Sequence, residues 1–194
     1  SINSYMQECN PTVKFNVFNG MTPAIVEGVR SDAYDVGFCS MSEGETDLCF
    51  TPILSQEYAT IVNKKHPLAS LAGQPMKLED LEPYEILTYP ENSPVGRIIK
   101  KELRKHNLKA THYGYDETTI GGYTAINQVV AIVADTPLLK QFDNLVHLDV
   151  KLEAEARLVY MVYHKNNYLT PAVKNYIQHV LDRGPEFGGV STLA

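Results

Sequence analysis

Hydrophobic and polar residues alternate along the chain in short segments that predict strands and helices in turn. Residues 13–18 carry large apolar side chains at nearly every second position and stop at Asn19-Gly20, as a strand followed by a turn does. Residues 22–30 then place apolar side chains at helical spacing, and residues 35–39 form a short apolar run suited to a strand buried on both faces. This order of strand, helix and strand predicts a βαβ unit with parallel strands.

The rest of the chain continues this alternation. Four expected helices begin with Ser or Thr directly before Pro, which combines an N-cap side chain with a first-turn residue that needs no N–H partner. Each of these helices begins at or near the carboxyl end of a strand, where open α/β sheets collect ligands. The four pairs are Thr22-Pro23, Ser93-Pro94, Thr136-Pro137 and Thr170-Pro171. Further strands are expected at 58–62, 86–89, 112–115, 129–133 and 158–163, and a further helix begins at Asp116 or Thr118.

Composition narrows the class of protein. The 194 residues carry a formal charge of −6, which argues against an extended surface of this chain that binds a nucleic-acid backbone. One basic cluster, within residues 100–105, is interpreted as the solvated face of a helix. No apolar run is long enough for a membrane helix and no signal peptide is recognisable, so we expect a cytoplasmic protein that does not contact membranes.

Signals of catalysis are absent from the sequence. It has no GxSxG, HExxH, GxGxxG or phosphate-loop motif, and its six histidines lack the spacing of metal ligands. Three cysteines without CxxC spacing favour neither a disulfide framework nor a zinc site. We therefore expect no enzyme activity, no metal and no cofactor.

Several segments in a fixed order carry a family resemblance. They are Val17 to Phe38, Pro52-Ile53-Leu54, His66-Pro67-Leu68-Ala69 and Leu169-Thr170-Pro171-Ala172-Val173. In this order and spacing, from about Tyr5 to Asp182, the chain resembles the effector-binding domain of LysR-type transcriptional regulators.

The resemblance implies an α/β protein with a two-lobed fold like the type 2 periplasmic binding proteins. Each lobe would be a mainly parallel sheet flanked by helices, with two crossover segments between them. Lobe one would hold residues 1–60 plus 155–194, and lobe two residues 61–154. The N-terminal helix-turn-helix of the family is absent from this chain, in agreement with its acidic charge.

The sequence departs from the family in two further places. Ser4-Tyr5-Met6 already resembles the late part of the first helix, so the opening strand and its Ser/Thr loop have no counterpart. Asn127-Gln128-Val129 stands where the family usually has a Gly-x-Gly turn. Part of the effector site therefore cannot be assigned by resemblance.

Five residues are expected to bind the effector when the family pattern is transferred. Each has a second interpretation, since Thr22 and Ser93 can be helix caps, Ser40 a turn serine and Tyr115 a packing residue. Converging hydroxyls and helix amides without a fixed countercharge favour a carboxylate or another small anion. Arg97 could clamp it or be a surface residue. The five expected effector-binding residues are Thr22, Ser40, Ser93, Tyr115 and Thr118.

The main hypothesis is a ligand-sensing regulatory domain of a LysR-type regulator. It would bind a small-molecule effector between the lobes, act as a homodimer or higher homo-oligomer, and reach DNA only through a module outside this chain. The alternative is a free-standing solute-binding protein of a transport system, which shares the fold. An enzyme on this fold is disfavoured because no acid, base and nucleophile converge.

Overall fold

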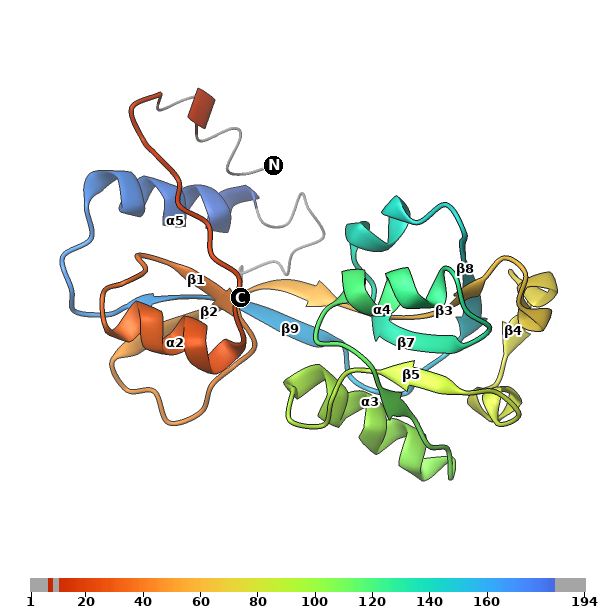
Figure 1. Cartoon of the computed structure of the whole chain (residues 1–194). Coiled ribbons are helices and arrows are strands. Elements are labelled where there is room, and N and C mark those ends of the chain that lie inside the picture. The colour runs from red at the N-terminus through yellow and green to blue at the C-terminus, as the bar shows by residue number, and fades with distance from the viewer. Residues whose placement is uncertain (1–6, 9–10, 184–194) are drawn as a thin grey trace. The chain divides into compact units, whose positions relative to one another are not determined.

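The computed structural model describes residues 7–8 and 11–183, and the chain divides into two compact units. Unit 1 combines residues up to Ser55 with residues from Leu158 onward, and unit 2 runs from Gln56 to Arg157. The chain therefore passes from unit 1 to unit 2 once and returns once (Figure 1). Residues 4–6, which prompted the expectation about the opening strand, lie outside the described residues.

Unit 1 has a three-stranded sheet with a helix on each face. Its strands are β1 (Gly37–Cys39), β9 (Arg157–His164) and β2 (Leu48–Gln56), in the order β1-β9-β2. Val162 of β9 packs in the cluster of α2 (Thr22–Arg30), whereas Met161 packs in the cluster of α5 (Pro171–Arg183). Because successive side chains of a strand point to opposite faces, α2 and α5 cover opposite sides of this sheet. β1 pairs antiparallel with β9.

The expected strand over residues 13–18 is wrong, because these residues form no strand. Their aromatic side chains pack individually instead. The Phe15 ring lies 5.6 Å from that of Tyr176 on α5, and the Phe18 ring stacks 5.4 Å from that of Tyr34. Val13 and Phe15 are half-buried, whereas Val17 and Phe18 are exposed, so the alternation does not mark a strand. The expected parallel βαβ pairing with residues 35–39 does not form among the described residues.

Unit 2 has a six-stranded mixed sheet. Its strand order is β4-β8-β3-β7-β5-β6, and the neighbours β7, β5 and β6 are parallel to one another. β3 runs antiparallel to β7 and β8, and β4 runs parallel to β8. The strands are β3 (Tyr58–Asn63), β4 (Pro75–Met76), β5 (Ile86–Thr88), β6 (Thr111–His112), β7 (Val130–Ala134) and β8 (Leu145–Val150).

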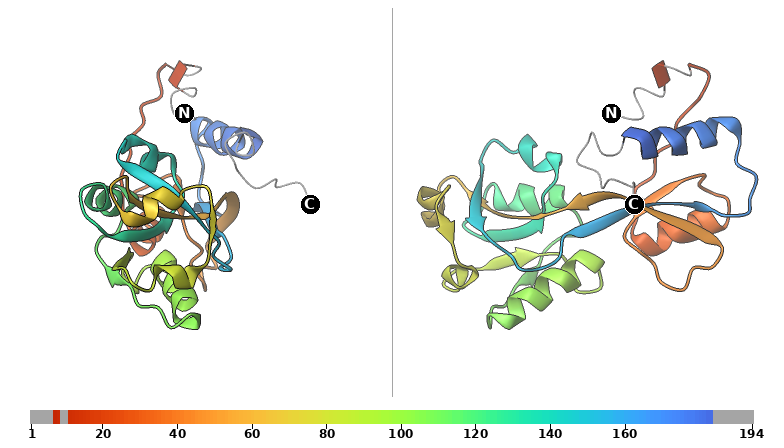
Figure 2. Two further views of the ribbon diagram at one scale, coloured as in Figure 1. Left: turned by 90° about the vertical axis from the view of Figure 1, so that its right-hand side faces the viewer. Right: turned by 180° about the vertical axis from the view of Figure 1, so that it is seen from behind.

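Helices complete unit 2 around a continuous apolar core. α3 (Pro94–Lys105) contributes Ile99 and Leu103, and α4 (Glu117–Thr124) contributes Ile120, all fully buried beside the buried β7. The predicted α/β class is confirmed in both units. The sheets are mixed rather than mainly parallel, since β1 pairs antiparallel with β9 in unit 1 and β3 pairs antiparallel with β7 and β8 in unit 2. Three short 3₁₀ helices, η1 (Pro67–Leu71), η2 (Leu78–Leu81) and η3 (Pro137–Gln141), connect the strands (Figure 2).

The basic cluster lies on α3 among carboxylates. Arg104 Nη2 lies 2.5 Å from Glu91 Oε1, and Lys105 Nζ lies 2.7 Å from Glu102 Oε2. Glu102 is only 2% exposed, and its Oε1 accepts the Glu153 amide at 3.1 Å, so it fixes the segment between β8 and β9 to the helix. The cluster is therefore partly neutralised within unit 2.

Candidate functional site

The parallel strands β5, β6 and β7 end at one edge of the unit 2 sheet. Because β3 is antiparallel to β7, its first residue, Tyr58, lies at the same edge, opposite Ala134. The backbone amide of Asp135 donates to the Glu57 carbonyl at 2.8 Å, which extends this pairing beyond the strands. We call this region the carboxyl edge; it is formed by residues 56–58, 89, 113–118 and 134–136, together with Arg157, whose guanidinium bonds Gln56. Ligands of open α/β sheets bind at such edges.

Tyr89 fixes the geometry of the carboxyl edge. This buried residue directly follows β5, and its hydroxyl donates to Glu117 Oε1 at 2.5 Å while accepting the Ala134 amide at 3.0 Å. One side chain thereby joins β5, β7 and the first turn of α4. Burial, followed by the negative charge of Glu117, raises the pKa of Tyr89, so this phenol remains a neutral hydrogen-bonding group.

Two buried hydroxyls at the carboxyl edge have no protein partner among the described residues. They are Tyr58 Oη and Thr136 Oγ1. Tyr58 pairs with Ala134 in the ladder, and Thr136 lies two residues further along the same chain. Since buried polar atoms are nearly always hydrogen-bonded, these hydroxyls are suited to contact a small polar molecule. Burial raises the pKa of Tyr58, and the positive charge of Arg157 opposes that rise.

The predicted residues of unit 2 differ in how available their polar groups are. Ser93 is buried at the start of α3, where its hydroxyl donates to the Pro90 carbonyl at 2.8 Å and accepts the Gly96 amide at 3.0 Å. Ser93 is thus the predicted helix cap. Tyr115 is 60% exposed and Thr118 is exposed, so both side chains can reach a ligand.

The start of α4 already holds a negative charge. Asp116 accepts the Thr119 amide at 2.8 Å and the Thr119 hydroxyl at 3.0 Å, which confirms Asp116 as the N-cap. An anion at this helix end would meet the Asp116 carboxylate, so the helix amides alone give little affinity for it. Arg97, the clamp considered from the sequence, is exposed and donates to the Asn92 carbonyl at 3.3 Å.

The two predicted residues of unit 1 lie at one end of that unit. α2 begins at the end of unit 1 where β1 finishes, and Ser40 directly follows β1 (Figure 1). Ser40 is buried and Thr22 is half-buried. The expectation that Thr22 caps α2 is wrong. Met21 occupies the N-cap position and provides no side-chain cap, because the helix begins at Thr22 itself with Pro23 in its first turn.

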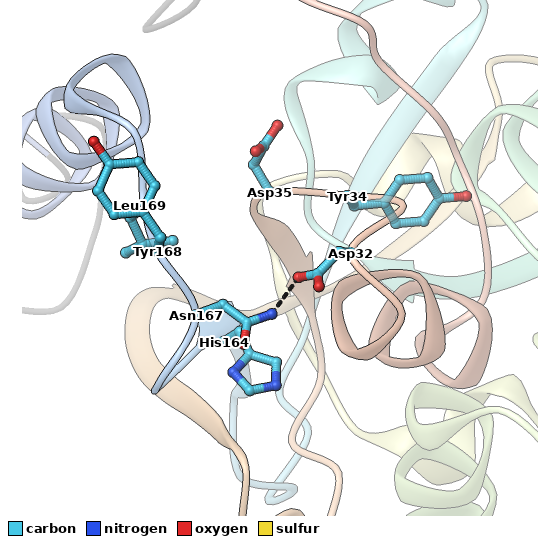
Figure 3. A pocket seen from close by; sticks show the side chains of 7 residues that line it. All are labelled: Asp32, Tyr34, Asp35, His164, Asn167, Tyr168 and Leu169. Atoms are coloured by element: carbon cyan, nitrogen blue, oxygen red, sulfur yellow. Dashed lines mark hydrogen bonds between the residues drawn. The ribbon is translucent and has the colours of Figure 1, made fainter.

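A polar hollow of about 390 Å³ lies elsewhere in unit 1 (Figure 3). Its side chains do not converge on one point. Asn167 Nδ2 donates to Asp32 Oδ1 at 2.5 Å, while Asp35 and Tyr34 point away from this pair. The hollow thus lacks the converging groups of a binding site. It is lined by Asp32, Tyr34, Asp35, His164, Asn167, Tyr168 and Leu169.

Metal sites and membrane-spanning helices are both lacking over residues 7–8 and 11–183. These residues contain no group of three His, Cys, Asp or Glu side chains that could hold a metal ion. In the same part of the chain, no helix has the length and apolar character needed to cross a membrane.

Three residues of the carboxyl edge were not predicted as site residues. Tyr58, Tyr89 and Arg157 come together through pairing between distant strands, and the Gln56–Arg157 contact spans 101 positions of sequence. The only local signal is that Tyr89 directly follows a predicted strand. Tyr58 and Arg157 stand at strand beginnings, which become part of this edge only when the antiparallel pairing is known.

Comparison by sequence and comparison by structure with known proteins point to the same family. The family model of the LysR substrate binding domain matches residues 4–185. The effector-binding domain of QuiR in complex with shikimate is 23% identical with a TM-score of 0.80, over 95% of this chain and 89% of that chain. The CcmR regulatory domain of Synechocystis PCC6803, in complex with 2-PG, is 15% identical with a TM-score of 0.76, over 92% and 87%.

The BenM effector-binding domain with its effector benzoate is also similar. It is 16% identical with a TM-score of 0.77, over 96% of this chain and 86% of that chain. Structural similarity at such low identity demonstrates a shared fold. No curated protein sequence matches this chain.

Proposed function

The chain belongs to the LysR substrate binding domain family, and we propose that it is the sensor of a LysR-type transcriptional regulator. It binds a small anionic effector between its two lobes, which correspond to units 1 and 2. The domain catalyses no reaction. The effector has different affinities for the conformations that the lobes can adopt, so its binding shifts the balance between these conformations. The domain works in the cytoplasm as a homo-oligomer, and a separate module of the regulator contacts DNA.

One observation carries the assignment of the site to the carboxyl edge. Tyr58 Oη and Thr136 Oγ1 are buried without a protein partner among the described residues, and exposed Tyr115 and Thr118 belong to the same edge of the sheet. These groups can donate hydrogen bonds to a carboxylate or a neighbouring hydroxyl. The ligands of QuiR and BenM, shikimate and benzoate, are both carboxylates, which supports the choice of chemical class.

Thermal-shift screening of small carboxylates tests the proposed function. A true effector raises the midpoint of unfolding in a concentration-dependent manner. Thr22→Ala and Ser40→Ala, in unit 1, are each expected to reduce the binding free energy of that effector by about 0.5–1.5 kcal/mol, the net contribution of one hydrogen bond. Ser70→Ala is the control, because this serine only bonds the Pro67 carbonyl on η1.

Two results would contradict the proposal. If no carboxylate or other small anion stabilises the protein, the anionic class is wrong. If an anion binds with equal affinity to the wild type, Thr22→Ala and Ser40→Ala, the predicted part of the site in unit 1 is wrong.

A further inference from the structure

Arg157 joins the two places at which the chain passes between the units. It is the first residue of β9, and its Nη1 donates to Oε1 of Gln56, the last residue of β2, at 3.2 Å. The chain enters unit 2 at Gln56 and leaves it at Arg157. This side-chain bond adds to the backbone pairing that already makes β2 and β9 neighbours in the sheet of unit 1.

The same pair belongs to the carboxyl edge. Gln56 immediately precedes Glu57, whose carbonyl accepts the Asp135 amide, and Tyr58, which pairs with Ala134. The guanidinium of Arg157 thus lies near the end of β7. Its positive charge also acts on Tyr58 and Tyr89, where it opposes the rise in pKa caused by burial.

The charges at the carboxyl edge indicate why Arg157 would be needed to bind an anion there. Asp116 and Glu117 place two carboxylates at the start of α4, and they would repel an anionic ligand. Arg97, in contrast, is exposed in the first turns of α3 and bonds a loop carbonyl. Glu57 and Asp135 add two further carboxylates to this edge. Arg157, bonded to Gln56, is a cation there that can offset part of this negative charge. Its planar fork matches a carboxylate better than a lysine ammonium does.

We propose that Arg157 selects anionic effectors and that the effector competes with Gln56 for its guanidinium. The inference rests on the proposed function and names the regulatory step at that site. Without an effector, Arg157 ties the first crossover strand to the second. When a carboxylate binds, the guanidinium turns toward it and the bond to Gln56 Oε1 weakens, so that occupancy of the site changes the stiffness of both crossovers.

If the effector competes with Gln56 for Arg157, substitutions of Arg157 and of Gln56 should change effector affinity in opposite directions. Arg157→Gln removes the charge and should weaken binding of benzoate or shikimate at least tenfold, while binding of neutral benzamide changes less than twofold. Gln56→Ala removes the competing acceptor and should strengthen benzoate or shikimate binding two- to threefold. Arg97→Gln is the matched control, because it makes the same change of charge on α3 and should alter binding less than twofold. Affinities are measured by isothermal titration calorimetry.

Hydrogen exchange supplies a readout that needs no ligand. In the free protein, Gln56→Ala and Arg157→Lys should both speed exchange of the amides at residues 56–58 and 157–159, since the tie between the crossovers is weakened. Arg157→Lys retains the charge, so it should still prefer benzoate to benzamide. Arg157→Met, which also removes the charge, replaces Arg157→Gln if the latter fails to fold.

The outcomes separate the inference from the proposed function. If the wild type binds a carboxylate and Arg157→Gln binds it equally well, the inference is wrong while the proposed function stands. If Gln56→Ala weakens binding as Arg157→Gln does, the bond is only structural and the competition is wrong. If the wild type binds neither benzoate, shikimate nor any carboxylate of the screen, the anionic function itself fails, and the inference fails with it.

Discussion

His66 is a buried histidine whose protonation the fold opposes. Its Nδ1 accepts the Leu68 amide at 3.2 Å, so the ring caps η1 as a neutral base, and it packs 4.8 Å from the Tyr84 ring. Burial lowers the pKa of His66 below its usual value near 6.5. The folded state therefore binds a proton less readily than the unfolded chain does.

The consequence is a loss of stability on acidification. Below about pH 6.5 the unfolded chain takes up a proton that folded His66 resists, so the free energy of unfolding decreases as the pH falls toward the lowered folded pKa. His66→Asn offers a side-chain oxygen as the N-cap acceptor in place of the ring Nδ1 and removes the titration. The variant should lose less stability than the wild type between pH 7.5 and 5.5 in urea titrations. Equal losses in both proteins would show that His66 does not control this range.

At the scale of elements, glycines in α3 and α4 respond in opposite ways to the same substitution. A Cβ at Gly96 would lie 2.1 Å from the Pro90 carbonyl oxygen, whereas a Cβ at Gly122 would find only ordinary contacts with Phe142, from 3.6 Å. Gly96→Ala should therefore destabilise the protein by about 1–3 kcal/mol, because the first turn of α3 must move away from the capping loop. Gly122→Ala should stabilise it by up to about 1 kcal/mol through helix propensity.

Denaturant unfolding of both variants measures these effects. The two substitutions add the same methyl group to a helix, so propensity alone predicts that both are stabilising. A stable Gly96→Ala protein would mean that α3 and the loop at Pro90 are less closely packed than the structure indicates.

The helices could be predicted from local sequence because their signals are local. Ser93 caps α3 from the predicted position, and Thr170 Oγ1 accepts the Val173 amide at 3.4 Å in the first turn of α5. Residues 13–18 show why strands are harder to predict. An alternating pattern does not by itself make a strand, because a strand also needs a neighbour, and here Phe15 and Phe18 contact the rings of Tyr176 and Tyr34 instead. Strand pairing depends on residues far away in sequence.

The same limit applies to the candidate site. Tyr115 and Thr118 could be predicted because they lie between a predicted strand and a predicted helix. Arg157 and Gln56 meet through crossovers separated by the whole of unit 2, so no local pattern could connect them. The roles of Arg157 and Gln56, and those of all five expected residues toward an effector, stay predictions until binding is measured; the five are Thr22, Ser40, Ser93, Tyr115 and Thr118.

At the scale of the whole molecule, the two units differ in chain continuity and in the size of their apolar cores. Unit 2 is one continuous stretch from Gln56 to Arg157, and it contains a single large apolar cluster around β3, β5 and β7. Unit 1 is assembled from two segments that unit 2 separates, and its apolar side chains form two smaller clusters on opposite faces of its sheet. Unit 2 has the continuity and the core that independent folding requires.

We therefore expect residues 56–157, expressed alone, to fold and to unfold cooperatively in urea. Circular dichroism and a dispersed amide NMR spectrum measure this directly. Residues 1–55 joined to 158–194 by a short linker should be much less stable, because their core is smaller. If the isolated unit 2 is unfolded while the complete chain is folded, its stability comes from unit 1 or from the crossovers.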